Sequence, residues 1–142
     1  MDNIIAIIPA RAGSKSLIDK NVKLLSGHPL LAYSIAVAKM SKKIDRVIIS
    51  TDSKEYAEIA RQYGAEVPFI RPNEYAEDSS SDKSFFVHAI NWFQDNENYS
   101  PEYWVHLRPT TPLREVKIID NAIESIINDI NSTSLRSGHK AP

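Results

Sequence analysis

A loop suited to binding anions follows the first apolar segment of the chain. Residues 9–21 read Pro-Ala-Arg-Ala-Gly-Ser-Lys-Ser-Leu-Ile-Asp-Lys-Asn, which combines three cations, one glycine and two hydroxyls. Gly13 permits close approach of the backbone to a phosphate, and Ser14 can donate a hydrogen bond to it. Arg11 and Lys20 can neutralise negative charge, one as a planar fork and the other as a point charge. The composition therefore favours a polyphosphate site, with a solvated basic loop as the alternative.

Several other site signatures are absent from the sequence. There is no GxxxxGK[ST] spacing and no GxGxxG spacing, so the kinase, ATPase and dinucleotide-binding interpretations lose their main support. The four histidines show no metal-ligand spacing such as HExxH, and we predict no metal site from them. The candidate chemistry depends on the loop.

Four apolar or β-branched segments predict the strands that would position such loops. The first, Ile4 to Ile8, is continuously apolar, as expected of a parallel strand covered on both faces. The others are residues 46–50, 67–70 and 103–107. The last of these is stopped by Pro109 and Pro112, so a loop must begin there.

Helical stripes separate these strands. One begins near Pro29 and carries Leu31, Ile35 and Ala38; another follows Thr51-Asp52-Ser53, whose short polar side chains suit an N-cap, and closes at Gly64. The remaining stripes are Phe86, Ala89, Ile90 and Phe93, and then Ile119, Ile123, Ile126, Ile127 and Ile130. The alternation predicts one α/β domain over residues 1–142, with a Rossmann-like doubly wound, mainly parallel sheet and helices on both faces. Ligands of such sheets lie beyond the carboxyl ends of the strands.

The composition sets broad limits on function. The 142 residues include 17 basic and 18 acidic side chains, and the net charge of −1 does not suggest binding to nucleic acid or to a membrane surface. Because there is no cysteine, disulfides, thiolate metal sites and a cysteine nucleophile are excluded. The apolar run near the N-terminus is too short for a signal peptide or a membrane span, and we expect a cytoplasmic protein.

Short motifs stand at the ends of all four predicted strands. Pro-Ala-Arg-x-Gly-Ser-Lys is followed five residues later by Lys-Asn, and Ser50-Thr51-Asp52 follows the second strand. Arg71-Pro72 with Asp78-Ser79-Ser80 follows the third, and Pro109-Thr110-Thr111-Pro112-Leu113-Arg114 follows the fourth. In this order the motifs resemble those of the acylneuraminate cytidylyltransferase family, also called CMP-sialic acid synthetases. The resemblance spans nearly the whole chain and corresponds to the N-terminal part of the family.

The resemblance implies a role for each matching residue. Arg11 and Lys20 would act in catalysis by neutralising phosphate charge, Asn21 would meet the nucleoside, and Arg71 would read the cytosine or its ribose. The full set implied in CTP binding is Ala10, Arg11, Ser14, Lys15, Lys20, Asn21, Arg71 and Ser80. Asp78, Ser79 and Ser81 have capping of the following helix as an equal alternative.

The sugar is implied by two further positions. Arg108 and Thr110 would face it; Arg108 stands where relatives often place glutamine, and it would pair either with a sugar carboxylate or with a neighbouring acid. Asp82 also departs from the family, which often has a hydroxyl there. In related enzymes that activate the eight-carbon sugar Kdo, the first loop usually continues with Lys-Pro. The pair Lys20-Asn21 therefore points to an acidic nine-carbon sugar of the neuraminate, legionaminate or pseudaminate type.

The family's reaction is attack of the anomeric hydroxyl of the sugar on the α-phosphate of CTP, with loss of pyrophosphate. It implies Mg²⁺, whose aspartate ligands would lie beyond residue 142; Asp52 is a weaker candidate that would equally serve as an N-cap. We therefore expect a chain truncated at its C-terminus and, in the full-length family, a homodimer. Two alternatives stay open: an inactive CTP-binding fragment, and another sugar nucleotidyltransferase of the same fold.

Overall fold

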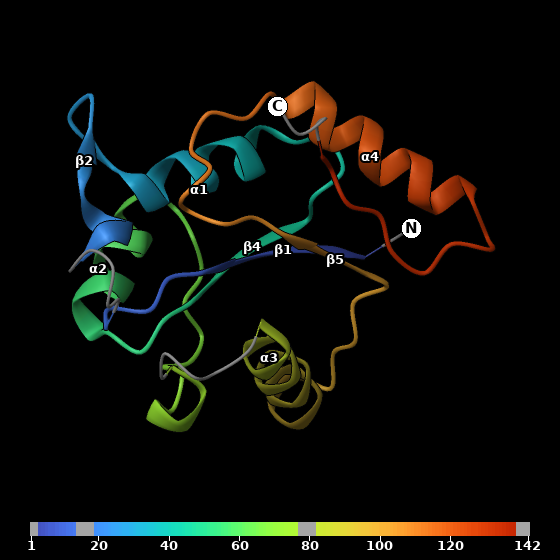
Figure 1. The fold of residues 1–142 in the computed structure, drawn as a ribbon. Coiled ribbons are helices and arrows are strands. Elements are labelled where there is room, and N and C mark those ends of the chain that lie inside the picture. The colour runs from blue at the N-terminus through green and yellow to red at the C-terminus, as the bar shows by residue number, and fades with distance from the viewer. Residues whose placement is uncertain (1–2, 14–18, 77–81, 139–142) are drawn as a thin grey trace.

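A parallel sheet with helices on both faces forms the centre of the computed structural model, which describes residues 3–13, 19–76 and 82–138 (Figure 1). Within those residues the sheet has the strand order β4-β1-β5, built from β1 (Ile4–Pro9), β4 (Arg46–Ser50) and β5 (Tyr103–His106). Helices α1 (Leu30–Met40) and α4 (Val116–Asn128) cover one face, and α3 (Asp82–Glu97) covers the other. The predicted Rossmann-like α/β class is confirmed.

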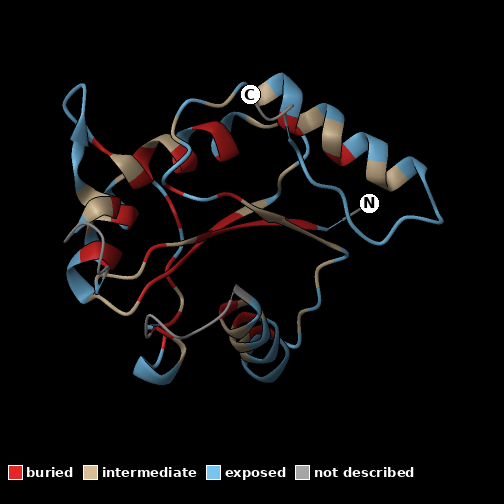
Figure 2. Cartoon of the chain, in the orientation of Figure 1, coloured by how far each residue is buried: buried red, intermediate tan, exposed pale blue. Residues whose placement is uncertain are grey.

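The continuous apolar run of β1 is explained by burial on both faces. Ile4, Ala6 and Ile8 pack into a core cluster with α1, α4 and α2 (Lys54–Gln62). Ile5 and Ile7 pack into a second cluster that contains Phe85, Ala89 and Phe93 of α3. Figure 2 shows β1 and β4 as buried along most of their length. Because β1 pairs with both neighbours, it fixes where the other two strands end.

A short hairpin precedes α1 and was not predicted. Its strands, β2 (Leu24–Leu25) and β3 (His28–Pro29), are antiparallel, and Leu25 pairs with His28 across Ser26 and Gly27. Both turn residues have positive φ, 51° and 85°, which is the type I′ geometry that suits two-residue hairpins. Pro29 then ends β3 and stands at the N-cap of α1, so the predicted position of that helix is confirmed.

Helix α2 begins and ends through local signals. The Ser53 hydroxyl accepts a hydrogen bond from the Tyr56 backbone N–H at 3.2 Å, as an N-cap does. Gly64, with φ of 91°, follows the helix in the left-handed conformation that was predicted to close it.

The third predicted strand, residues 67–70, is wrong as a strand. Within the described residues this segment contributes one isolated parallel bridge, between Ile48 and Glu66, just before the predicted range. Pro68 has no backbone N–H to continue a ladder, while Phe69 is buried in the cluster against α3. Backbone hydrogen bonds at Glu66 and Arg71 join the two ends of the segment to β4 and to Thr51, and between them Phe69 packs into the core.

The C-terminal predictions also need correction. Helix α4 ends at Asn128, and Ile130 of its predicted stripe is 94% exposed. The Asp129 carboxylate accepts hydrogen bonds from the Asn131 N–H at 3.1 Å and the Ser132 hydroxyl at 2.6 Å, which forms a local turn that competes with helix continuation. Residues 134–137 are exposed and form no strand. No helix in the described ranges is long and apolar enough to span a membrane.

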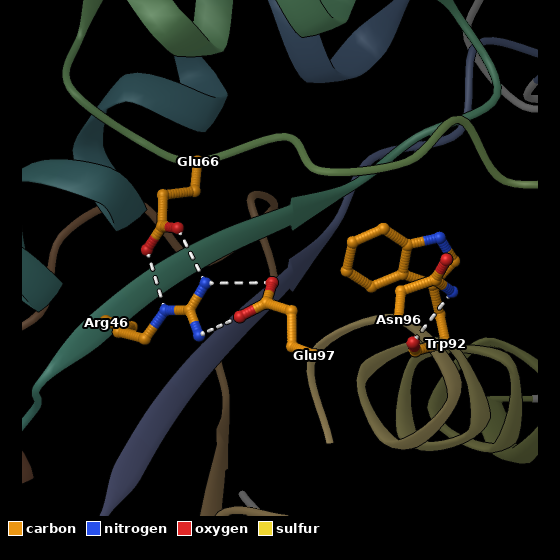
Figure 3. Close-up of polar contacts among 5 residues, drawn as sticks. All are labelled: Arg46, Glu66, Trp92, Asn96 and Glu97. Atoms are coloured by element: carbon orange, nitrogen blue, oxygen red, sulfur yellow. Dashed lines mark hydrogen bonds and ion pairs between the residues drawn. The ribbon is translucent and has the colours of Figure 1, made fainter. Parts of the chain in front are cut away.

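An ion-pair cluster fastens the amino end of β4 to α3 (Figure 3). Arg46 donates to both carboxylate oxygens of Glu66, at 2.7 and 3.0 Å, and to Glu97 at 3.0 Å. Its guanidinium carbon also lies 5.1 Å from the Phe93 ring centroid and 5.2 Å from that of Tyr99. The cluster joins β4, the segment after α2 and the end of α3. It lies at the amino ends of the strands, opposite the candidate loops.

Replacing Arg46 should lower stability without touching the candidate site. We expect Arg46→Ala to lose about 1 to 2 kcal/mol of unfolding free energy, because two half-exposed ion pairs and two cation–π contacts are removed. Urea unfolding measures this, with Arg136→Ala, an exposed arginine after α4, as control. Equal stability of the two variants would show that the cluster contributes nothing.

Candidate functional site

Three loops meet at the carboxyl ends of β1 and β4. Pro9 pairs with Ser50 at the last register position, and Ala10 N–H donates to the Ser50 carbonyl at 2.9 Å, so the pairing continues one residue past β1. The Arg71 backbone N–H donates to the Thr51 carbonyl at 2.7 Å. The loop after β1, the turn after β4 and the segment after Glu66 are thereby brought to one place, as the sequence predicted.

The start of the first loop is held by the turn after β4. Ala12 N–H donates to Asp52 Oδ1 at 2.9 Å, and Arg11 Nη1 donates to the Gly13 carbonyl at 3.2 Å. Ala10 is fully buried, whereas the Arg11 side chain is half-buried. Asp52 was considered as an N-cap or a metal ligand, but Ser53 is the N-cap and the Asp52 carboxylate is a loop anchor.

The end of the loop forms a 3-10 turn, Lys20–Val22, that presents Lys20 and buries Asn21. Asp19 precedes it with φ of 54°, and its carbonyl accepts from Val22 N–H at 3.1 Å. Asn21 Nδ2 donates to the Arg11 carbonyl at 3.0 Å. The side-chain amide of Asn21 therefore links the two described stems of the loop, and Lys20 lies next to that link.

Arg71 is a buried cation that grips the end of β4. It is 4% exposed; Nε donates to Ser50 Oγ at 3.0 Å, Nη2 to the Ser50 carbonyl at 2.7 Å and Nη1 to the Tyr75 carbonyl at 3.1 Å. Burial lowers the pKa of Arg71 to about 10, the Asp52 carboxylate raises it and Arg11 lowers it. Arg71 therefore stays charged at neutral pH, and an electron-rich ligand beside it would be attracted.

The loop after β5 is built around the Arg108 carbonyl. This one oxygen accepts from Thr111 N–H at 3.2 Å, Arg114 Nη2 at 3.0 Å and Ser34 Oγ at 3.2 Å. Arg114 Nη1 also donates to Ser34 Oγ at 3.1 Å, and burial lowers the pKa of Arg114. Ser34 is fully buried in α1, so the loop is fixed to that helix. The side chains of Arg108 and Thr110, predicted to face the sugar, are both exposed.

The predicted residues divide into three groups. Those brought together at the ends of β1 and β4 are Ala10, Arg11, Lys20, Asn21 and Arg71. Arg108 and Thr110 lie on the loop after β5. Ser14, Lys15 and Ser80, with Asp78, Ser79 and Ser81, lie outside the described residues.

Sequence reasoning missed three supporting side chains. Ser34 and Tyr56 fall within predicted helices and were given no role, and Arg114 was noted only as part of a motif. Tyr56, buried in α2, donates its hydroxyl to Asp19 Oδ1 at 2.5 Å. Nothing in the local pattern separates these polar atoms from ordinary helix or loop residues, because their partners are distant in sequence.

The described residues do not provide a metal site. They contain no group of three histidine, aspartate or glutamate side chains that could hold an ion. The two carboxylates nearest the first loop, Asp52 and Asp19, accept hydrogen bonds from Ala12 and Tyr56. These residues do not fit Mg²⁺.

Comparison with known proteins assigns the family. A family model described as cytidylyltransferase matches residues 5–139. The chain belongs to the cytidylyltransferase family. It is 43% identical over 121 residues to N-acylneuraminate cytidylyltransferase of Escherichia coli, and 40% identical over 121 residues to CMP-N,N'-diacetyllegionaminic acid synthase of Legionella pneumophila. The matches cover 85% of this chain in both cases, and 27% and 52% of the two relatives.

One further relative and two solved structures are also similar to the chain. Pseudaminic acid cytidylyltransferase of Campylobacter jejuni is 36% identical over 125 residues, which cover 88% of this cytidylyltransferase chain and 53% of that relative. The chain thus spans about half or less of these curated relatives. The structure of CMP:2-keto-3-deoxy-manno-octonic acid synthetase complexed with CTP has a TM-score of 0.76 at 17% identity, covering 90% of this chain and 48% of that one. A cytidylyltransferase from Leptospira borgpetersenii gives 0.68 at 23% identity, with coverages of 92% and 51%. These two structural likenesses support the fold.

The Ser34 hydroxyl should be needed to hold the loop after β5. We expect Ser34→Ala to lower the unfolding free energy by about 1 to 2 kcal/mol, because a half-buried Arg114 N–H and the Arg108 carbonyl each lose a partner. Exchange of the Thr111 amide hydrogen should also quicken. The matched control is Ser125→Ala, whose hydroxyl bonds the Asn121 carbonyl on the exposed face of α4. Unchanged stability and exchange in Ser34→Ala would contradict this role.

Proposed function

We propose that this cytidylyltransferase chain carries the CTP-binding part of an enzyme that transfers CMP to the anomeric hydroxyl of an acidic nine-carbon sugar. The observation that supports it most directly is the meeting of Arg11, Lys20 and Arg71 around the ends of β1 and β4. Three cations at the carboxyl edge of a parallel sheet suit a ligand that carries a triphosphate and an acceptor-rich base.

The proposed reaction needs positioning and charge neutralisation. The oxygen of the sugar hydroxyl bonds to the α-phosphorus and its proton passes to solvent, while the bond from that phosphorus to the bridging oxygen breaks and pyrophosphate leaves with the electron pair. Arg11 and Lys20 would stabilise the negative charge on the transferring and leaving phosphates. Ser14 and Lys15, from the same loop, would contribute further donors.

The base and the sugar would be read by different loops. Three N–H groups of Arg71 donate hydrogen bonds to Ser50 and Tyr75. Its remaining N–H groups, together with Ser80, would hydrogen-bond the cytosine or the ribose. Arg108 and Thr110, on the fixed loop after β5, would contact the sugar, and the Arg108 cation suits its carboxylate. The names of the three curated relatives, which refer to neuraminic, legionaminic and pseudaminic acids, support a nine-carbon acid.

Other parts of the proposal depend on the resemblance alone. The resemblance implies Mg²⁺, for which the described residues offer no group of three ligands. A homodimer likewise stays a prediction from the resemblance, whereas a cytoplasmic location stays a prediction from the short apolar run near the N-terminus. The main alternatives are a chain that binds CTP without turnover, and a related sugar nucleotidyltransferase with another nucleotide.

The reaction can be tested directly by following pyrophosphate release from CTP, Mg²⁺ and each of the three acids. We expect release with one of them and preference for CTP over UTP and GTP. CTP binding in calorimetry without release from any acid would favour the binding-only alternative. Preference for UTP or GTP would favour a different nucleotidyltransferase, and no nucleotide binding would reject all three.

The assignment of the first loop can be tested by calorimetry with CTP. Arg11→Ala and Lys20→Ala should each weaken CTP binding about tenfold or more, because a charge-assisted contact contributes about 1.5 to 3 kcal/mol. Lys43→Ala is the matched control, since Lys43 is an exposed cation that precedes β4 at the opposite end of the sheet. Unchanged affinity in both loop variants would mean that the loop is only solvated.

A further inference from the structure

Two side chains from the region where α2 begins hold the two described stems of the loop after β1. Asp52 Oδ1 accepts from Ala12 N–H at 2.9 Å on the incoming side. Tyr56 donates its hydroxyl to Asp19 Oδ1 at 2.5 Å on the outgoing side. Asp52 precedes the N-cap Ser53, and Tyr56 lies in the first turn of the helix. The start of α2 therefore acts as one rigid support for both stems.

Tyr56 is well placed to transmit rigidity. Its side chain is 2% exposed and belongs to the core cluster that contains Ile8 and Leu31, so its ring has little freedom. Burial raises the pKa of Tyr56, and the hydrogen bond to Asp19 raises it further, so the phenol stays protonated and donates at neutral pH. The hydroxyl connects this fixed ring to the exposed residue Asp19.

Asp19 controls the direction of the next residues. Its φ of 54° lies in the left-handed region, where a non-glycine residue needs support from its surroundings. From there its carbonyl accepts from Val22 N–H, which closes the turn that carries Lys20 and Asn21. Asn21 then bonds the Arg11 carbonyl. A chain of contacts thus leads from the Tyr56 hydroxyl to the two residues expected to meet CTP.

The same hydrogen bond also restrains a negative charge. Asp19 adjoins Lys20, and a freely rotating carboxylate there would repel a triphosphate. While it accepts from Tyr56, the carboxylate is held toward α2. Loss of the hydroxyl would therefore both loosen Lys20 and release an anion beside the phosphates.

We propose that Tyr56 is a positioning residue for triphosphate binding, acting through Asp19 on Lys20, with Asp52 fixing the opposite stem. The proposal rests on the proposed function, because it assumes that the loop binds CTP. It assigns Tyr56 no contact with the nucleotide. The proposal predicts a selective effect: loss of the Tyr56 hydroxyl should weaken the binding of CTP and leave the binding of cytidine nearly unchanged.

The test compares Tyr56→Phe with Tyr63→Phe in calorimetry with CTP and with cytidine. Tyr63 is a matched control, because it follows the same helix and its hydroxyl bonds His28 Nδ1 at 3.0 Å, away from the loop. We expect Tyr56→Phe to weaken CTP binding about tenfold, as for loss of a hydrogen bond to a charged group, and to leave cytidine binding within about twofold. Tyr63→Phe should change neither.

Two Asp19 variants separate tethering from general damage. Asp19→Asn keeps an oxygen acceptor for Tyr56 and removes the charge, so CTP binding should be kept. Asp19→Ala should weaken CTP binding like Tyr56→Phe, and it decides the question if Tyr56→Phe fails to fold. Unchanged CTP affinity in Tyr56→Phe, or in Asp19→Ala where the former is unfolded, would overturn the proposal; so would equal losses for CTP and cytidine.

Failure of the proposed function would appear differently. If the parent chain binds no CTP, the function and the role in triphosphate binding both fall. Exchange of the Val22 amide hydrogen then shows whether the tether itself exists, because it should quicken in Tyr56→Phe and not in Tyr63→Phe. Normal CTP binding by the parent together with an unaffected Tyr56→Phe variant rejects the positioning role alone.

Discussion

The parallel pairing of β1 with β4 is the constraint on which the candidate site depends. The pairing brings Pro9 level with Ser50, and the Ser50 carbonyl then accepts from Ala10 N–H. The same carbonyl accepts from Arg71 Nη2. One backbone oxygen therefore joins the start of the first loop to Arg71, which lies 21 residues after Ser50. Since β1 is buried on both faces, this junction is rigid.

Electrostatics gives that junction its chemical character. Arg71 is almost fully buried, and its hydrogen bonds in the described residues go to neutral acceptors at Ser50 and Tyr75. The charge of Arg11 is close enough to lower the pKa of Arg71, while the Asp52 carboxylate raises it. A cation that is desolvated and only partly compensated is costly in the unliganded protein. A ligand with many acceptors would offset that cost, which fits a nucleotide.

The loops around the junction are shaped by side chains that form hydrogen bonds within the protein. Asp52 and Tyr56 hold the stems of the first loop, and Ser34 with Arg114 holds the loop after β5. Ser34 and Tyr56 lie in helices α1 and α2, Asp52 lies just before α2, and Arg114 donates to Ser34. Loops supported in this way can present charged groups with little ordering cost on binding.

The local patterns of the sequence were enough to predict β1, β4, β5 and the four helices, because burial on one or two faces imposes a period that each segment carries by itself. They were also enough, through motifs at the strand ends, to predict the family, now confirmed, and to name Arg11 and Arg71 as candidates. The hydrophobic pattern failed at two places where a single residue interrupts the element. Pro68, which has no backbone N–H, interrupts the third predicted strand, and the hydrogen bonds of Asp129 end α4 before Ile130.

Only the tertiary structure decided which polar atoms support the site. Asp52 meets Ala12 across 40 positions, Tyr56 meets Asp19 across 37, and Arg114 meets Ser34 across 80. A hydrogen bond between residues so far apart depends on how helices seat on the sheet to within a fraction of an ångström. No short window of sequence contains that information. The sequence by itself therefore determined the elements and the charged candidates, and the packing of the elements determined what holds those candidates in place.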